Sequence, residues 1–236
     1  MRGFFVCFSA SASFALSGVL FGVGAKSLKR SPSWQHVMFA STPLLFATQQ
    51  ASEGVVWLTS DGSAHGTVHR LAVVAFLGFA LVVWPVWLPF SLLLIERNPA
   101  RSKALAGLFW LGAAAAATAV VLLTRYQPIA VVAGHSIRYN RAGHTTGLLE
   151  ALVLLAYFSP TILPLFVSTA PLARAIGIAL ALSLVITAVI ERTALTSVWC
   201  FFAAILSGLI CVAMGRSEFS TAGPPLAEFT LRSEAT

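Results

Sequence analysis

Seven long apolar stretches follow one another along this chain of 236 residues, and they constrain its fold more than any other feature. Each has close to the ~20 residues that an α-helix needs to cross about 30 Å of hydrocarbon. Their apolar residues are continuous rather than alternating, which argues against the strands of a membrane barrel. We therefore predict an all-α fold, a polytopic membrane helix bundle with seven transmembrane helices. The predicted helices are Gly3–Ala25, Val37–Thr59, Leu71–Ile95, Ala104–Thr124, Thr145–Val167, Leu172–Ile190 and Leu195–Met214.

The composition fits a chain surrounded by lipid. Hydrophobic residues make up 58% of the chain and charged residues 10%, whereas soluble domains have roughly 45–50% apolar and about 25% charged residues. The mean hydropathy is +0.86. The net charge of +7 comes mostly from short segments between the apolar stretches, where basic residues set orientation. The lipid bilayer is therefore the expected partner, and a nucleic-acid partner is excluded.

The positions of Lys and Arg predict how the chain is oriented. With seven spans, nine of the 15 basic residues fall on the side that holds the C-terminus and six on the other side. The richer side is normally cytoplasmic. We therefore predict a multi-pass protein of the cell (cytoplasmic or inner) membrane with its N-terminus outside and its C-terminus in the cytoplasm. The nine are Lys26, Lys29, Arg30, Arg97, Arg101, Lys103, Arg174, Arg216 and Arg232.

Two segments outside the helices have their own character. In the long loop Arg125–Gly143, the residues Ile129–Ala133 and Ser136–Tyr139 are typical of two strands joined by a tight Gly-His turn. We expect this short β-hairpin to cap the outer mouth of the bundle. Residues 217–236 turn polar and contain Pro, Gly and Ser. They predict a mobile polar tail after a seven-helix domain at residues 1–216.

Four segments resemble an uncharacterised family of bacterial seven-helix integral-membrane proteins. They are the Cys-Phe-Ser-Ala start at Cys7–Ala10, the Gln-Gln-x-x-Glu-Gly-x-Val-Trp motif at Gln49–Trp57, Trp84–Trp87, and the Trp-Cys-Phe-Phe-Ala-Ala motif at Trp199–Ala204. Together they span most of the chain. The resemblance implies seven helices, and it implies no activity.

The clearest candidate for chemistry is a glutamate inside a predicted span. An ionisable side chain there costs free energy and requires a partner or a purpose. Glu53 lies toward the outer side of the second helix, with Gln50 and Gln49 three and four residues before it and Trp57 four residues after it. Helical spacing places Gln50, Glu53 and Trp57 on one face. Glu53 is either a structural carboxyl group hydrogen-bonded to neighbouring helices or a group that binds a ligand, a proton or a metal ion.

A second intramembrane glutamate lies at a similar depth. Glu150 is six residues into the fifth predicted helix, and His144 lies at the mouth of that helix. Because a charged group that faced hydrocarbon would be strongly penalised, we expect Glu53, Gln50 and Glu150 to point into one cavity in the outer half of the bundle. This cavity would be an outward-facing polar pocket under the predicted hairpin.

Evidence for a cofactor is weak. His65 and His69 have the i, i+4 spacing of a helical pair that holds a divalent transition metal, with a carboxylate such as Glu53 completing the shell. Gly66 between them disfavours a helix. The chain has no nucleotide-binding loop and no motif for covalent haem attachment. Cys7 and Cys200 are either an outer pair that could oxidise or small buried side chains.

Three functions of different classes remain open, and no catalytic residue is identifiable. The first is a bundle that binds a small or lipid-like ligand in the polar pocket around Glu53. The second is an accessory or structural subunit of a larger membrane complex or a homo-oligomer, because 17 Phe and 6 Trp need lipid or protein neighbours. The third is a proton-linked transporter that uses helices kinked at Pro85 and Pro89 and at Pro160 and Pro164.

Overall fold

The computed structural model describes residues 9–60, 66–133, 136–140, 148–190 and 195–215. Within them the chain is mostly helical, with one two-stranded sheet. The elements in chain order are α1 (Ala10–Lys29), α2 (Trp34–Ala40), α3 (Thr42–Thr59), α4 (Thr67–Gly78), the π-helical η1 (Phe79–Val83), α5 (Trp84–Leu93), α6 (Pro99–Arg125), β1 (Ile129–Ala133), β2 (Ser136–Asn140), α7 (Leu148–Val167), α8 (Ala173–Ile190) and α9 (Leu195–Met214).

Within the described residues, each predicted apolar stretch is helical. One break between helices was not predicted from the sequence. The predicted second helix is divided at Ser41 into α2 and α3. Pro43 lies in the first turn of α3, where it has no N–H to donate to Phe39 and so cannot continue α2. The backbone N–H of Ser41 instead closes α2 on Val37. The break turns α3 into a separate rod that begins inside the apolar stretch.

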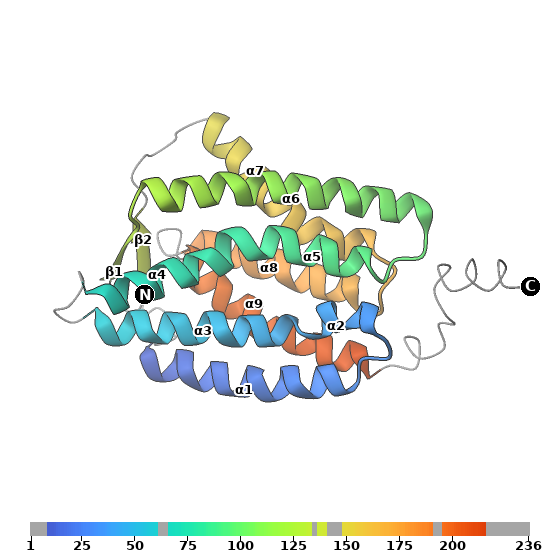
Figure 1. The fold of residues 1–236 in the computed structure, drawn as a ribbon, viewed down its shortest axis with the longest axis horizontal. Helices are drawn as coiled ribbons and strands as arrows, with labels where there is room; N and C mark the ends of the chain where they lie inside the picture. The colour runs from blue at the N-terminus through green and yellow to red at the C-terminus, as the bar shows by residue number, and fades with distance from the viewer. Residues whose placement is uncertain (1–8, 61–65, 134–135, 141–147, 191–194, 216–236) are drawn as a thin grey trace, which may run out of the picture.

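The hairpin lies at one end of the helices, as predicted (Figure 1). The strands β1 and β2 are antiparallel, with Val131 opposite Arg138. Ala130 and Ile137 are buried against side chains of α3, α4 and α9. The ring of Tyr139 stacks on Phe76 of α4, with 4.8 Å between the ring centroids. The hairpin is therefore packed into this end of the bundle, which we call the hairpin end.

Arginine side chains hold the opposite end, which we call the basic end. Arg30, just after α1, donates to the carbonyl oxygen of Cys211 in α9 over 3.2 Å. Arg101 in α6 donates to the carbonyl oxygen of Val167 at the end of α7 over 2.8 Å. The last carbonyls of a helix have no partner within the helix, and cations stabilise them. These two contacts hold the end of α1 beside the end of α9 and the start of α6 beside the end of α7.

Glu96 joins two loops at the basic end, and we call this contact the Glu96 clasp. The carboxylate of Glu96, between α5 and α6, accepts hydrogen bonds from the backbone N–H of Thr169 over 2.7 Å and of Asn98 over 3.0 Å. Burial raises the pKa of Glu96, but these hydrogen bonds outweigh it and lower the pKa below its ordinary value. Asn98 in turn caps α6 by accepting from the N–H of Ala100.

The bend between α4 and α5 has a defined cause. The N–H of Trp84 donates to Phe79, five residues back, which is the π-helical pattern. In that pattern the carbonyl of Ala80 would receive the N–H of Pro85, and proline has none. The hydroxyl of Tyr157 in α7 donates to this carbonyl instead. Ser91 donates to the carbonyl of Leu88 within its own turn.

A close contact with α6 accommodates the second proline of α5. Pro89 cannot donate to the carbonyl of Pro85, so that oxygen is left facing outward from the helix. Gly112 of α6 lies directly against this oxygen, and a Cβ at that position would overlap with it. Glycine is therefore required where α5 and α6 cross.

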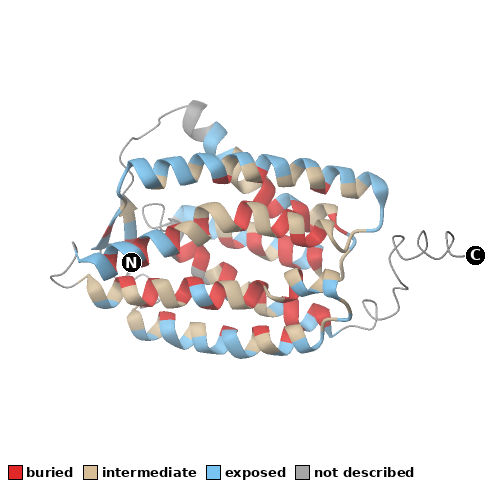
Figure 2. Cartoon of the chain, in the orientation of Figure 1, coloured by how far each residue is buried: buried red, intermediate tan, exposed pale blue. Residues whose placement is uncertain are grey.

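Many large apolar side chains lie on the outer surface of the bundle, where exposed residues are pale blue in Figure 2. Large side chains such as Phe21 of α1 and Trp110 of α6 are 66% and 70% exposed. Three of the described helical segments, Ala10–Lys29, Thr67–Leu93 and Pro99–Arg125, are long and apolar enough to cross a membrane. Exposed apolar surface on this scale is unusual for a soluble monomer and fits a membrane protein.

Candidate functional site

Helix α3 carries three polar side chains into the core of the bundle. Gln49 and Gln50 are fully buried, and Glu53 is 2% exposed. Gln49 and Gln50 flank Glu53 on the helix surface because they precede it by four and three residues. On a different side of α3, the ring of Phe14 of α1 lies directly against Gly54, so α1 and α3 pack closely together.

The amide group of Gln49 has a fixed orientation. The indole N–H of Trp84 lies 2.7 Å from its Oε1 atom, and Trp84 also stacks on Phe46 with 3.9 Å between ring centroids. An indole nitrogen can only donate, so the amide oxygen must face Trp84 and the NH₂ group must point away from it. The side chain of Gln49 also lies within interaction range of the Cys200 thiol.

Tyr139 from the hairpin and Cys200 from α9 complete this site. Burial raises the pKa of the Tyr139 hydroxyl well above its usual value, and the nearby Glu53 carboxylate and Cys200 thiol raise it further. The hydroxyl therefore keeps its proton at physiological pH. We call Gln49, Gln50, Glu53, Tyr139 and Cys200 the buried polar cluster.

The buried polar cluster has unused hydrogen-bonding capacity. Among the described residues, Nε2 of Gln49, both polar atoms of the Gln50 amide and the hydroxyl of Tyr139 are buried and have no hydrogen-bond partner. Such groups are uncommon in proteins, because each loses its hydrogen bonds to water on burial. The arrangement can therefore hold a molecule that supplies the missing partners.

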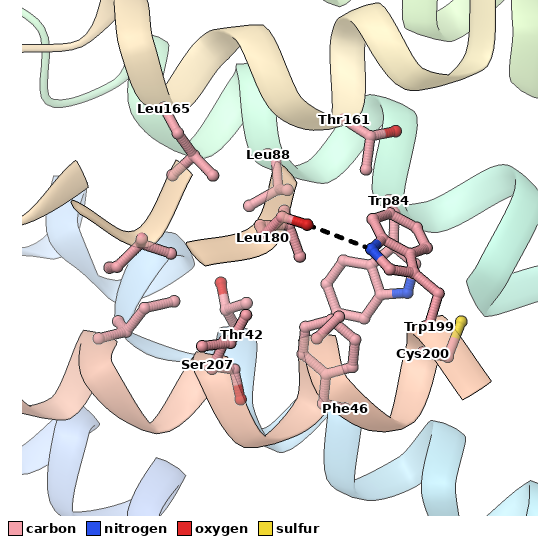
Figure 3. A pocket seen from close by; sticks show the side chains of 14 residues that line it. Thr42, Phe46, Trp84, Leu88, Thr161, Leu165, Leu180, Trp199, Cys200 and Ser207 are labelled. Atoms are coloured by element: carbon pink, nitrogen blue, oxygen red, sulfur yellow. Dashed lines mark hydrogen bonds between the residues drawn. The ribbon is translucent and has the colours of Figure 1, made fainter. Parts of the chain in front are cut away.

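An apolar cavity of about 30 Å³ adjoins the cluster. Phe46, Trp84, Trp199 and Cys200 surround one end of it, and Thr42, Leu165 and Ser207 lie toward the other (Figure 3). Trp84 and Cys200 line the cavity, Cys200 belongs to the cluster and Trp84 donates to Gln49, so the cavity and the cluster are neighbours. The lining comes from α3, α5, α7, α8 and α9: Thr42, Phe46, Trp84, Leu88, Thr161, Leu165, Ile176, Leu180, Trp199, Cys200, Ala203, Leu206, Ser207 and Ile210.

The structure describes only some of the residues of the predicted pocket. Glu53 and Gln50 are buried together, but neither lines the cavity, which is apolar. Glu150 lies in α7, and its side chain is outside the described residues, as is all of His144. Trp57 is half-buried against the hairpin, with an indole nitrogen that has no hydrogen-bond partner among the described residues.

The predicted histidine pair is described for one member only. His69 is buried, and its Nδ1 atom lies 2.9 Å from the Thr59 hydroxyl. The Thr59 hydroxyl also lies 2.7 Å from the Val55 carbonyl oxygen. His65 lies outside the described residues. Among the residues that the structure describes, no group of three or more His, Cys, Asp or Glu side chains could hold a metal ion.

Sequence reasoning missed the partners that reach the cluster from other helices. Trp84 and Cys200 stand in motifs of α5 and α9 that carry the family resemblance, but nothing in the sequence linked them to Glu53. Tyr139 stands in the predicted hairpin two residues after the buried Ile137, and the shared strand face is the signal that could have found it. The cysteines Cys200 and Cys211 are free thiols, and Cys7 lies outside the described residues.

The fold and the site define a helical protein with apolar helices long enough for a membrane and a polar cluster in its core. Residues 6–223 match a family of unknown function (DUF6629), and the chain belongs to that family. No curated protein and no solved structure matches it.

Proposed function

We propose that this chain is a seven-span membrane bundle that binds a small lipid-like ligand in its core. The observation that carries the proposal is that the apolar cavity and the buried polar cluster are neighbours that share Trp84 and Cys200. An amphiphilic molecule could place its chain in the cavity and its polar end at the cluster. A site for a small molecule usually combines an apolar pocket with a small number of precisely placed polar groups.

The seven spans are α1, α3, the α4–η1–α5 rod, α6, α7, α8 and α9. The contacts of Arg30 with α9 and of Arg101 with α7 support alternation, because each joins two ends that an even number of crossings returns to the same side. The concentration of Lys and Arg at the basic end supports a cytoplasmic position for that end. The N-terminus would then lie outside and the C-terminus in the cytoplasm of the cell membrane.

The size of the cavity limits the ligand. A volume of about 30 Å³ holds about two water molecules, whereas sites for drug-sized ligands have roughly 300–1,000 Å³. The ligand is therefore slender, such as a single alkyl chain, and Leu88, Leu165 and Leu206 must change rotamer to admit it. Water gains little in a cavity with an apolar lining, which favours an apolar occupant.

Binding of tritiated 1-decanol to the full chain in nanodiscs tests the proposal. Equilibrium dialysis against empty nanodiscs should give saturable binding near one molecule per chain. Ala203→Phe, which fills the cavity, should abolish it, and so should Leu206→Phe at a less buried lining position. Ala117→Phe, on the exposed face of α6, should leave it unchanged. Binding equal to empty nanodiscs, or full binding in both folded cavity variants, contradicts the proposal.

Proton-linked transport is the second candidate function. The observation that favours it is the contact between two proline-interrupted rods, where Tyr157 of α7 bonds to the π-helical turn before Pro85. Irregular turns of this kind often occur in the moving helices of transporters. Uptake of a transported solute into proteoliposomes under a proton gradient should collapse in Glu53→Gln. It should persist in Ser52→Ala, which changes a residue on another face of α3. Equal uptake by the two variants would contradict this candidate.

A further inference from the structure

The unused hydrogen-bonding groups of the buried polar cluster are mostly donors. The Gln49 amide oxygen already accepts from Trp84, so its NH₂ group has only donors to offer. The NH₂ group of Gln50 and the hydroxyl of Tyr139 add further N–H and O–H groups without a partner among the described residues. A ligand that satisfies them must present an oxygen atom that accepts several hydrogen bonds.

We propose that the buried polar cluster binds the carbonyl oxygen of a neutral amphiphilic molecule whose chain occupies the adjoining apolar cavity. This inference rests on the proposed function and specifies the chemistry of the ligand's polar end. In this complex, the amide NH₂ groups of Gln49 and Gln50 in α3 and the hydroxyl of Tyr139 in the hairpin would donate hydrogen bonds to that oxygen. Trp84 holds the Gln49 amide in the donating orientation.

The carboxyl group of Glu53 excludes an anionic head group. A carboxylate or phosphate of the ligand would lie beside Glu53, which is 2% exposed and close to both Tyr139 and Cys200. Two negative charges repel strongly where the surroundings are poorly polarisable. A neutral carbonyl accepts the same hydrogen bonds without this repulsion.

The orientation of Gln49 disfavours a cationic head group. An ammonium group carries only donors, so even paired with Glu53 or the Gln50 oxygen it would leave the NH₂ groups of Gln49 and Gln50 and the Tyr139 hydroxyl unpaired. A head group without any acceptor is disfavoured for the same reason. Sites built to hydrogen-bond a ligand reject analogues that lack the matching group more strongly than apolar pockets do.

Four probes with the same chain and different head groups test the inference. They are tritiated 2-undecanone, undecane, undecylammonium and undecanoate, each dialysed against the full chain in nanodiscs and against empty nanodiscs. After correction for partition into lipid, the ketone should bind at least about tenfold more tightly than undecane, the effect of one good hydrogen bond. The ammonium and the carboxylate should bind more weakly than the ketone.

Gln50→Met isolates the head-group contact, because it keeps the length of the side chain and removes the amide. The ketone should lose its advantage over undecane in this variant, with the affinity for undecane unchanged. Ser52→Ala, which removes a hydroxyl from the neighbouring face of α3, should behave as wild type. The infrared C=O stretch of the bound ketone should lie below its value in hydrocarbon and shift upward in Gln50→Met.

The outcomes separate this inference from the proposed function. If the ketone and undecane bind equally and Ala203→Phe abolishes both, the cavity binds chains and the carbonyl inference is wrong. Tighter binding of the ammonium or carboxylate probe also overturns it. If none of the probes binds above empty nanodiscs, the proposed function itself fails.

Discussion

Single residues matter most in this chain where backbone atoms come close together. Gly112 is such a residue, since the Pro85 carbonyl occupies the space of a Cβ. In contrast, Gly18 and Gly22 have open space around them, although their spacing resembles a helix-packing motif. The neighbouring Ser17 makes the contact with α3 instead, by donating to the carbonyl of Ala47 over 2.8 Å.

Gly112→Ala should destabilise the bundle by about 1–3 kcal/mol, because α5 and α6 must move apart to admit the methyl group. Gly107→Ala in the same helix is the matched control, since nothing lies within 4 Å of a Cβ there. That change should be neutral or slightly stabilising. Thermal unfolding in nanodiscs measures both, and equal midpoints for the two variants would contradict the close contact.

The Glu96 clasp predicts a dependence of stability on pH. Hydrogen bonds from Thr169 and Asn98 lower the pKa of Glu96 in the folded state despite its partial burial. A group with a lowered folded pKa stabilises the fold above its unfolded pKa and loses this effect as pH falls through the folded value. Between pH 7 and acid pH, wild type should lose more stability than Glu96→Gln. Parallel losses in the two proteins would show that the clasp does not contribute.

At the scale of elements, the bend at η1 is the least expected feature. Proline accounts for the bend, and Tyr157 from α7 makes it tolerable by satisfying the Ala80 carbonyl. Irregular backbone inside a membrane persists only where neighbouring groups re-satisfy it. The π-helical turn thus depends on a side chain 77 residues away in the sequence.

Tyr157→Phe should destabilise the protein by roughly 1–3 kcal/mol, because it leaves a buried carbonyl without a partner. Tyr126→Phe is the control, since Tyr126 is exposed at the end of α6. Denaturant unfolding of the two variants measures the difference. A change of similar size in both would contradict a stabilising role of the hydrogen bond from Tyr157 to the Ala80 carbonyl.

The sequence predicts elements well where the signal is local. Continuous apolar residues predicted α9 at Leu195–Met214, and the Gly-His turn between two strand-like segments predicted β1 at Ile129–Ala133, both as observed. The break at Ser41 was missed because the apolar stretch is long enough for one uninterrupted span, although Pro43 is a signal for it. The π-helical turn was missed because it depends on a contact from α7.

At the scale of the whole molecule, prediction of the candidate site stopped at one helix. Gln49, Gln50 and Glu53 could be grouped because helical spacing is local. Tyr139 and Cys200 join them through tertiary packing, which single-sequence periodicity does not encode. The same limit explains why an apolar cavity beside the cluster was not foreseen: its lining comes from five helices, and each contributes residues that look like ordinary core.

The two ends of the molecule should lie on opposite sides of the membrane. Val131 is 45% exposed at the hairpin end and Ala100 is exposed at the basic end, so each accepts a cysteine without loss of buried contacts. A membrane-impermeant maleimide added to intact cells should label Val131→Cys, whereas Ala100→Cys should require permeabilisation, because the Lys- and Arg-rich end faces the cytoplasm. Wild type under the same conditions sets the background from the native cysteines. Labelling of Ala100→Cys before Val131→Cys would reverse the orientation, and labelling of both in intact cells would contradict the alternation of spans.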